Sequence, residues 1–201
     1  MATDTIRDPF PLNTARLRLQ AAGPNDAAFI VSLWTDPRVM GFVGFPLGLP
    51  TSEEHVLRQI TDTSEDPFSR LLTVVRAANQ QRVGQARVGR VDAEGIVEPD
   101  IKLAPTFWNI GYGQEVWRTL ILCGFLQPAC RIVQGTPNVE NAGSIHMMER
   151  SGMRRSGERT FQPSGAMEEA MVPVHHYIYR MTRQEWEEQR KDQDTTRRVS
   201  Q

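Results

Sequence analysis

The stretch of residues 98–115 constrains the fold more than any other part of this chain. It reads EPDIKLAPTFWNIGYGQE, which is typical of a short strand, a tight turn and the first turn of a helix. Side chains alternate along a strand, so Ile101 and Leu103 share one face while charged residues share the other. Gly111 and Gly113 then open a long apolar helix.

Two glycines at the start of a helix remove Cβ atoms where unpaired N–H groups and the positive end of the dipole point outward. Such a start can receive the phosphates of a ligand, or it can be only a turn between strand and helix. A dinucleotide fingerprint would need a third glycine where Val116 stands. The Gly-Lys-Ser/Thr of a Walker phosphate loop is also missing from this stretch.

The 201 residues fit a single domain with a sizeable core. A formal net charge of -1, with acids and bases interspersed, gives no electrostatic reason to expect nucleic acid as a partner. No apolar run is long enough to cross a bilayer, and the polar N-terminus is unlike a signal peptide. We therefore expect a cytoplasmic protein that binds neither nucleic acid nor membrane.

The cysteines and histidines give no pattern of metal ligands. Cys123 and Cys130 lack the spacing of a metal or redox motif, so we expect buried, reduced thiols. His175 and His176 are neighbours in a strand and point to opposite faces, so they cannot chelate one metal ion. The other two histidines have no partner at ligand spacing. We expect no metal.

Strand and helix patterns follow one another in the order strand, two helices, three strands, helix, strand, helix and two strands. The strands are expected at residues 15–20, 71–76, 82–91, 98–104, 131–136, 154–161 and 171–181. This order indicates an α/β protein with a mixed sheet covered on both faces. We expect an N-terminal arm at residues 1–13, one domain at 14–187 and a polar, disordered tail at 188–201.

Four segments, taken in order, resemble the GNAT acetyltransferases, and specifically the ribosomal-protein N-alpha-acetyltransferase branch. They are residues 14–19, 104–113, 138–153 and 179–186, so the resemblance covers nearly the whole chain. It implies a mostly antiparallel, seven-stranded sheet with helices on both faces and a splayed central strand pair. It also implies transfer of the acetyl group of acetyl-CoA to a primary amine by direct attack in a ternary complex. The alternative is a non-catalytic acyl-CoA-binding sensor or interaction module on the same fold.

The resemblance implies that acetyl-CoA lies where the strand at 98–104 splays from that at 131–136. Main-chain N–H groups of the loop at 108–113 would hold the two phosphates. The expected cofactor contacts are Trp108, Ile110, Gly111, Tyr112, Gly113, Gln114, the backbone of Ile101 and Leu103 beside pantetheine, and Asn141. The family often has a basic residue at the third position of this loop. Ile110 stands there and takes a positive charge away from the phosphates.

Acetyl transfer to an amine requires loss of a proton from a group that titrates near ~10, a donor to the oxyanion, and departure of a thiol with a pKa near ~8.5. Glu98 is the first candidate for the base, through a water molecule, and Asp100 is the second. Both could instead be ordinary solvated carboxylates. The N–H of Leu103 could serve the oxyanion. Ser144 is either a donor to the thiolate or a helix cap.

The acceptor site is expected between an apolar segment at residues 40–50 and a loop at residues 162–170. The first segment mixes aromatic residues with glycine and proline, so it is either a hydrophobic connection or a mobile lip over the cleft. The acceptor is a small-molecule amine or a peptide N-terminus, and the sequence does not choose between them. A homodimer is compatible with the family.

Overall fold

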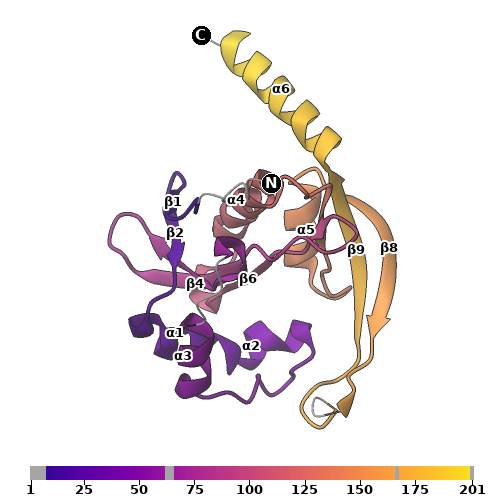
Figure 1. Cartoon of the computed structure of the whole chain (residues 1–201). Coiled ribbons are helices and arrows are strands. Elements are labelled where there is room, and N and C mark those ends of the chain that lie inside the picture. Colours follow the sequence, from indigo (N-terminus) through magenta and orange to yellow (C-terminus); the bar gives the residue numbers. More distant parts are fainter. Residues whose placement is uncertain (1–7, 62–65, 166–167, 200–201) are drawn as a thin grey trace, which may run out of the picture.

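The computed structural model describes residues 8–61, 66–165 and 168–199, which form two sheets (Figure 1). The first sheet is antiparallel throughout, in the order β1 (Leu12–Asn13), β2 (Leu17–Ala21), β3 (Leu72–Arg76), β4 (Arg82–Arg87) and β6 (Asp100–Leu103). The second has the order β5 (Ile96–Val97), β7 (Ile132–Gly135), β9 (Val174–Thr182) and β8 (Arg154–Phe161). Its β5–β7 pair is parallel and the other pairs are antiparallel.

Helices lie on opposite faces of this framework, as Figure 1 shows. On one face are α4 (Tyr112–Leu126) and α5 (Ala142–Glu149). On the other are α1 (Ala27–Trp34), α2 (Pro37–Met40) and α3 (Glu53–Thr61). The final helix, α6 (Arg183–Val199), projects away from the body. None of the described helices is both long and apolar enough to cross a membrane. The mixed α/β class with helices on both faces is confirmed.

The strand expected at residues 98–104 is broken in a way that shapes the site. Only Asp100–Leu103 of it form a strand, β6, which pairs with β4 in the first sheet, whereas β5, just before residue 98, pairs with β7 in the second. Glu98 and Pro99 make the crossing between them. Within the described residues β6 and β7 are not hydrogen-bonded neighbours. The expected splay is therefore a complete separation into two sheets.

Helix α4 holds the two sheets together by packing across both. A Cβ atom built on Gly124 would lie 2.8 Å from Val133 of β7 and 3.6 Å from Val97 of β5. At the other end of the helix, a Cβ on Gly113 would lie 3.8 Å from Leu103 of β6. Between these points the indole of Trp117 is fully buried in the main core. The long apolar helix predicted after the glycine turn thus forms the common core.

A second cluster packs α1 and α3 on the opposite face of the first sheet. Ile30 and Leu33 of α1 and Val56 of α3 are buried there. The indole Nε1 of Trp34 donates a hydrogen bond of 3.3 Å to the buried Gln85 of β4. Arg87, two residues further along β4, therefore faces the same side of the sheet as Gln85.

Both ends of the chain differ from the sequence prediction. Residues 12–13 of the expected arm pair with β2 as β1, and residues 1–7 lie outside the described part. Residues 188–199 of the expected disordered tail belong to α6. This helix is anchored where Arg183 donates hydrogen bonds to the carbonyls of Phe125, Gln127 and Cys130. The polar composition of the tail predicted disorder, and it carries no sign of these contacts with distant residues.

Candidate active site

Helix α4 begins with main-chain N–H groups that no side chain caps. Its N-cap is Gly111, with φ of 84° and no side-chain hydrogen bond at the cap. The first hydrogen bond back into the helix runs from the N–H of Glu115 to the carbonyl of Gly111, at 3.2 Å. The N–H groups of Tyr112, Gly113 and Gln114 precede it and have no acceptor within the helix. Three donors and the positive end of the dipole meet here.

Both glycines of this turn are required by their surroundings. Gly111 has a left-handed backbone, and a Cβ there would lie 3.2 Å from Nη2 of Arg16. A Cβ on Gly113 would lie 3.3 Å from Sδ of Met147 in α5. Asn109 also has a positive φ, of 59°. The turn is therefore tight because the loop and two neighbouring elements approach it closely.

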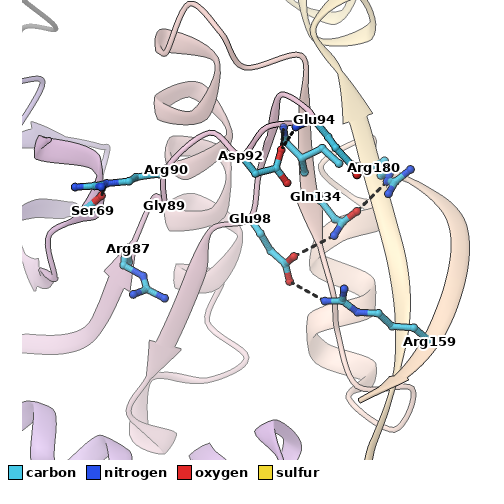
Figure 2. Close-up of a pocket in the computed structure, with 11 residues that line it drawn as sticks. Ser69, Arg87, Gly89, Arg90, Asp92, Glu94, Glu98, Gln134, Arg159 and Arg180 are labelled. Carbon is cyan, nitrogen blue, oxygen red and sulfur yellow. Dashed lines mark hydrogen bonds and ion pairs between the residues drawn. The ribbon is translucent and has the colours of Figure 1, made fainter. Parts of the chain in front are cut away.

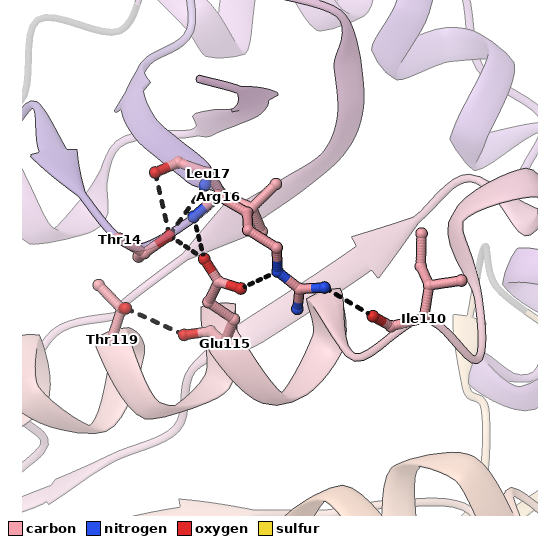
Figure 3. Close-up of polar contacts among 6 residues, drawn as sticks. All are labelled: Thr14, Arg16, Leu17, Ile110, Glu115 and Thr119. Carbon is pink, nitrogen blue, oxygen red and sulfur yellow. Dashed lines mark hydrogen bonds and ion pairs between the residues drawn. The ribbon is translucent and has the colours of Figure 1, made fainter. Parts of the chain in front are cut away.

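An arginine from the first sheet reaches this loop, and the sequence analysis missed it. Nη1 of Arg16 donates to the carbonyl of Ile110 at 2.9 Å, and its Nε donates to Glu115 at 2.8 Å (Figure 3). The guanidinium also lies 4.7 Å from the ring centroid of Tyr112. A positive charge thus stands beside the loop although Ile110 is apolar. In the sequence analysis Arg16 appeared only as part of the segment at residues 14–19 that resembles the family.

Glu115 holds Arg16 in place. Its carboxylate accepts hydrogen bonds from the main-chain N–H of Arg16, at 2.7 Å, and from the hydroxyl of Thr14. Burial alone would raise the pKa of Glu115, but the hydrogen bonds from Thr14 and Arg16 outweigh burial and lower it. The carboxylate is therefore charged at neutral pH and fixes the guanidinium against the loop.

Trp108 ties the beginning of the loop to β6. Its indole Nε1 donates a hydrogen bond of 2.8 Å to the carbonyl of Leu103. The ring of Phe107 stacks on that of Tyr112, with centroids 6.2 Å apart. Ile110 is 49% exposed, so its side chain points to solvent and only its backbone contributes to the loop. The predicted cofactor loop is thus ordered by contacts with neighbouring elements.

The outer edge of β6 faces the gap between the sheets. The N–H of Ala104 donates to the carbonyl of Val83 in β4, and Leu103 is paired with Gly84. Main-chain groups alternate in direction along an antiparallel strand, so those of Ile101 and Leu103 point away from β4. The Leu103 carbonyl is taken by Trp108, which leaves its N–H directed into the gap. This is the edge predicted to pair with pantetheine.

Glu98 stands where the chain crosses between the sheets and faces a hollow of about 540 Å³ (Figure 2). Its carboxylate accepts hydrogen bonds from Nε2 of Gln134, at 3.0 Å, and from the hydroxyl of Thr136. Arg159 approaches to 3.7 Å. Asp100, the second candidate for the base, is instead paired with Lys102 at 2.6 Å on its own strand. The geometry favours Glu98.

His176, which the sequence analysis considered only as a metal ligand and rejected, is a neighbour of Glu98. Its Nδ1 lies 3.0 Å from the carbonyl of Thr136, the residue whose hydroxyl binds Glu98. Burial lowers the pKa of His176, so the ring is neutral at pH 7. His175 is exposed and its Nε2 lies 3.8 Å from Glu158. The two rings diverge, as the alternation in the strand predicted.

Helix α5 begins differently from α4. Oδ1 of Asn141 accepts a hydrogen bond of 3.0 Å from the N–H of Ser144, so Asn141 is the N-cap. Ser144 takes part in this cap through its backbone. Among the described residues its hydroxyl has no hydrogen-bond partner. Of the two alternatives for Ser144, the helix cap does not hold for its side chain, because Asn141 supplies the cap.

The segment at residues 40–50 is held by hydrogen bonds from residues outside the loop at 162–170, one of them from just beyond its end. The carbonyl of Gly44 accepts a hydrogen bond of 2.8 Å from the N–H of Val172. Nδ2 of Asn138 donates to the carbonyl of Phe42 at 3.3 Å. Leu47 at the tip of the first segment is 89% exposed. Residues 166–167 of the second segment lie outside the described part of the chain.

The described residues contain no group of three or more His, Cys, Asp or Glu side chains arranged to hold a metal ion. Cys123 and Cys130 are free and buried. Burial raises the pKa of the Cys123 thiol to about 12 and that of the Cys130 thiol to about 11. Both are protonated at neutral pH and poorly nucleophilic.

The family model of the acetyltransferase (GNAT) domain matches residues 16–154. The chain belongs to the GNAT acetyltransferase family. The resemblance stated from the sequence is confirmed, and the protein is an acetyltransferase.

Solved structures of GNAT proteins share the fold. A GNAT acetyltransferase from Bacillus anthracis has a TM-score of 0.68 at 21% identity, over 86% of this chain and 98% of its own. A Vibrio cholerae protein described as a ribosomal-protein-serine acetyltransferase has a TM-score of 0.67 at 17% identity, over 87% and 98%. Spermidine N-acetyltransferase from Vibrio cholerae, solved with CoA and spermine, has a TM-score of 0.66 at 18% identity, over 85% and 97%.

Proposed function

We propose that this GNAT protein transfers the acetyl group of acetyl-CoA to a primary amine, with the cofactor between β6 and β7. The observation that carries the proposal is the coincidence of three features at one end of the gap. These are the outward edge of β6, the uncapped first turn of α4 and the positive charge of Arg16. The similar spermidine acetyltransferase was solved with CoA, which supports this choice of cofactor.

The residues present fit a diphosphate thioester. The N–H groups of Tyr112, Gly113 and Gln114 would hold the phosphates, because an uncapped helix start offers donors and a favourable dipole. The backbone of Ile101 and Leu103 would pair with the pantetheine arm. Acetyl-CoA supplies an acyl carbon that is open to attack and a thiol that can leave.

Glu98 is the proposed base. Its carboxylate would take the ammonium proton, through a water molecule, so that the amine can attack the acyl carbon. The hydrogen bonds from Gln134 and Thr136 orient it towards the hollow. The N–H of Leu103 would stabilise the oxyanion as the carbon–nitrogen bond forms and the carbon–sulfur bond breaks. The Ser144 hydroxyl would donate a hydrogen bond to the departing thiolate.

Two measurements test this function. Calorimetric titration with CoA should show binding, and a panel of small amines and peptides with free N-termini should release thiol from acetyl-CoA. A flat titration would contradict the cofactor assignment. Binding without thiol release above the rate of hydrolysis, for every amine tested, would contradict the proposed amine acceptor. A homodimer and the domain limits of 14–187 stay predictions, which sedimentation and truncation would test.

A further inference from the structure

The hollow beside Glu98 lies on the face of the sheets that is turned away from α4. Val97 and Val133 point into the core around α4. Side chains alternate along strands, so Glu98 and Gln134, the next residues along the chain, point to the opposite face. An acceptor entering this hollow would therefore approach from the side opposite the first turn of α4.

The same alternation brings arginines from both sheets into the hollow. Arg87 has the parity of Gln85, which contacts α1, and so faces this side of β4. Arg180 follows Tyr179, which is buried in the core around α4, and so it also faces the hollow. The arginines that line the hollow are Arg87, Arg90, Arg159 and Arg180.

Carboxylates of the protein do not neutralise all of this charge. Arg159 is 3.7 Å from Glu98, and Arg90 is 3.3 Å from Asp66. The hydrogen bond from Nε of Arg180 goes to the neutral amide of Gln134, at 2.8 Å. Within the described residues Arg87 has neither a hydrogen bond nor an ion pair from its side chain. It extends into the hollow from β4 (Figure 2).

The carboxylates that line the hollow are Asp92, Glu94 and Glu98. The side chain of Asp92 accepts hydrogen bonds from the main-chain N–H groups of Glu94, at 2.9 Å, and Ile96, at 2.8 Å, so it serves its own turn. Glu94 is exposed on that turn. Glu98 is the proposed base, which an amine would approach. An unpaired guanidinium therefore remains for a further anionic group.

We propose that the acceptor is an amine that also carries a carboxylate, and that Arg87 binds this carboxylate while the amine lies at Glu98. The inference rests on the proposed acetyl transfer and narrows its acceptor. Figure 2 shows Arg159 of the second sheet reaching Glu98, and Arg87 on the other side of the hollow, on the first sheet. A guanidinium matches a carboxylate through two parallel hydrogen bonds. A polyamine would instead bring further positive charge beside four arginines.

The test uses tripeptide amides with the same N-terminal residue, followed by two aspartates, two asparagines or two lysines. A free acidic amino acid and a polyamine complete the panel. With the native protein, kcat/KM should be about tenfold higher for the aspartate peptide than for the asparagine peptide. Arg87→Gln should abolish this ratio, because kcat/KM for the aspartate peptide falls to that for the asparagine peptide. Activity on the amino acid but not the peptide would identify a small acid as the source of the carboxylate.

Arg58→Gln is the control, because it removes the same charge from an exposed site on α3. The aspartate preference should survive in this variant. Equal rates for the aspartate and lysine peptides, or a preference that persists in Arg87→Gln, would overturn the proposal. Calorimetric titration of the same peptides with the CoA-bound protein reads the preference without turnover. If no peptide is acetylated, a tenfold difference in affinity that Arg87→Gln removes would still support carboxylate binding, and equal affinities would refute it.

Discussion

The two sides of the cleft use different parts of the polypeptide. At the start of α4 the donors are main-chain N–H groups, exposed because Gly111 provides no cap. At the hollow the polar groups are side chains, among them Glu98, Gln134 and four arginines. Main-chain donors suit a ligand that stays the same, because they depend little on side-chain identity. Side chains can be exchanged one at a time, which suits the proposed role of the hollow in selecting the acceptor.

The largest effect expected from this contrast is on turnover. Glu98→Gln should lower kcat by about a hundredfold, because the amide cannot accept the amine proton. Binding of CoA, measured by calorimetry, should be nearly unchanged, because Glu98 lies at the hollow and not at the main-chain donors of α4. Asp100→Asn is the matched control, since Asp100 is paired with Lys102. An unchanged pH–rate profile in Glu98→Gln would remove this residue from the role.

A smaller effect is expected on the main-chain side. Gly111→Ala should weaken CoA binding roughly tenfold, because a left-handed backbone with a Cβ costs about 1–2 kcal/mol and the methyl group crowds Arg16. The kcat at saturating acetyl-CoA should change less than KM. Gly157→Ala provides the control, because a Cβ there meets only Ile178, at an ordinary 3.8 Å. Equal effects of the two variants would argue against a ligand at this turn.

The capped start of α5 sharpens the comparison between the two helices. Asn141→Ala should lower the free energy of unfolding by about 1 kcal/mol, because the N–H of Ser144 loses its acceptor. Asn141→Asp should retain most of the stability. Urea denaturation measures both. If Asn141→Ala instead keeps its stability and loses CoA binding, Asn141 acts as a ligand contact, as the family resemblance first implied.

The smallest effect concerns the pH dependence of stability. His176 has a lowered pKa, so the folded protein binds its proton less readily than the unfolded chain, which titrates near ~6.5. Stability should therefore fall as the pH drops from about 7 towards this lowered pKa. His176→Gln should reduce the difference between urea midpoints at pH 7.5 and 5.5. The same change at the exposed His146 should leave the difference intact.

Local patterns predicted the elements that carry the cofactor site. The strand predicted at residues 98–104 contains β6, whose edge faces the proposed site. The glycine pair placed the start of the long helix correctly, because a positive φ and a close approach leave a mark in the sequence. A helix cap near Asn141 is expected from the sequence, but Ser144 and not Asn141 was considered as the capping residue. Such features depend on residues that lie close together along the chain.

The features that were missed depend on contacts between distant segments. A period of two shows that residues 98–104 are extended, but not that the two residues before them, β5, belong to a different sheet from β6. Arg87 and Arg159 line the same hollow only because β4 and β8, which are far apart in the sequence, both border it. The hydrogen bond from Arg16 to Ile110 joins residues that are 94 positions apart in the sequence. No local spacing signals any of these.

The position of α4 across both sheets has a mechanical consequence. Because no ladder of backbone hydrogen bonds joins β6 to β7, the helix resists their separation mainly through its apolar contacts. A molecule bound both to the first turn of α4 and to the edge of β6 would add further contacts between the helix and the first sheet at this gap. Occupancy by CoA should therefore raise the melting temperature by favouring the closed, intact body over the unfolded chain.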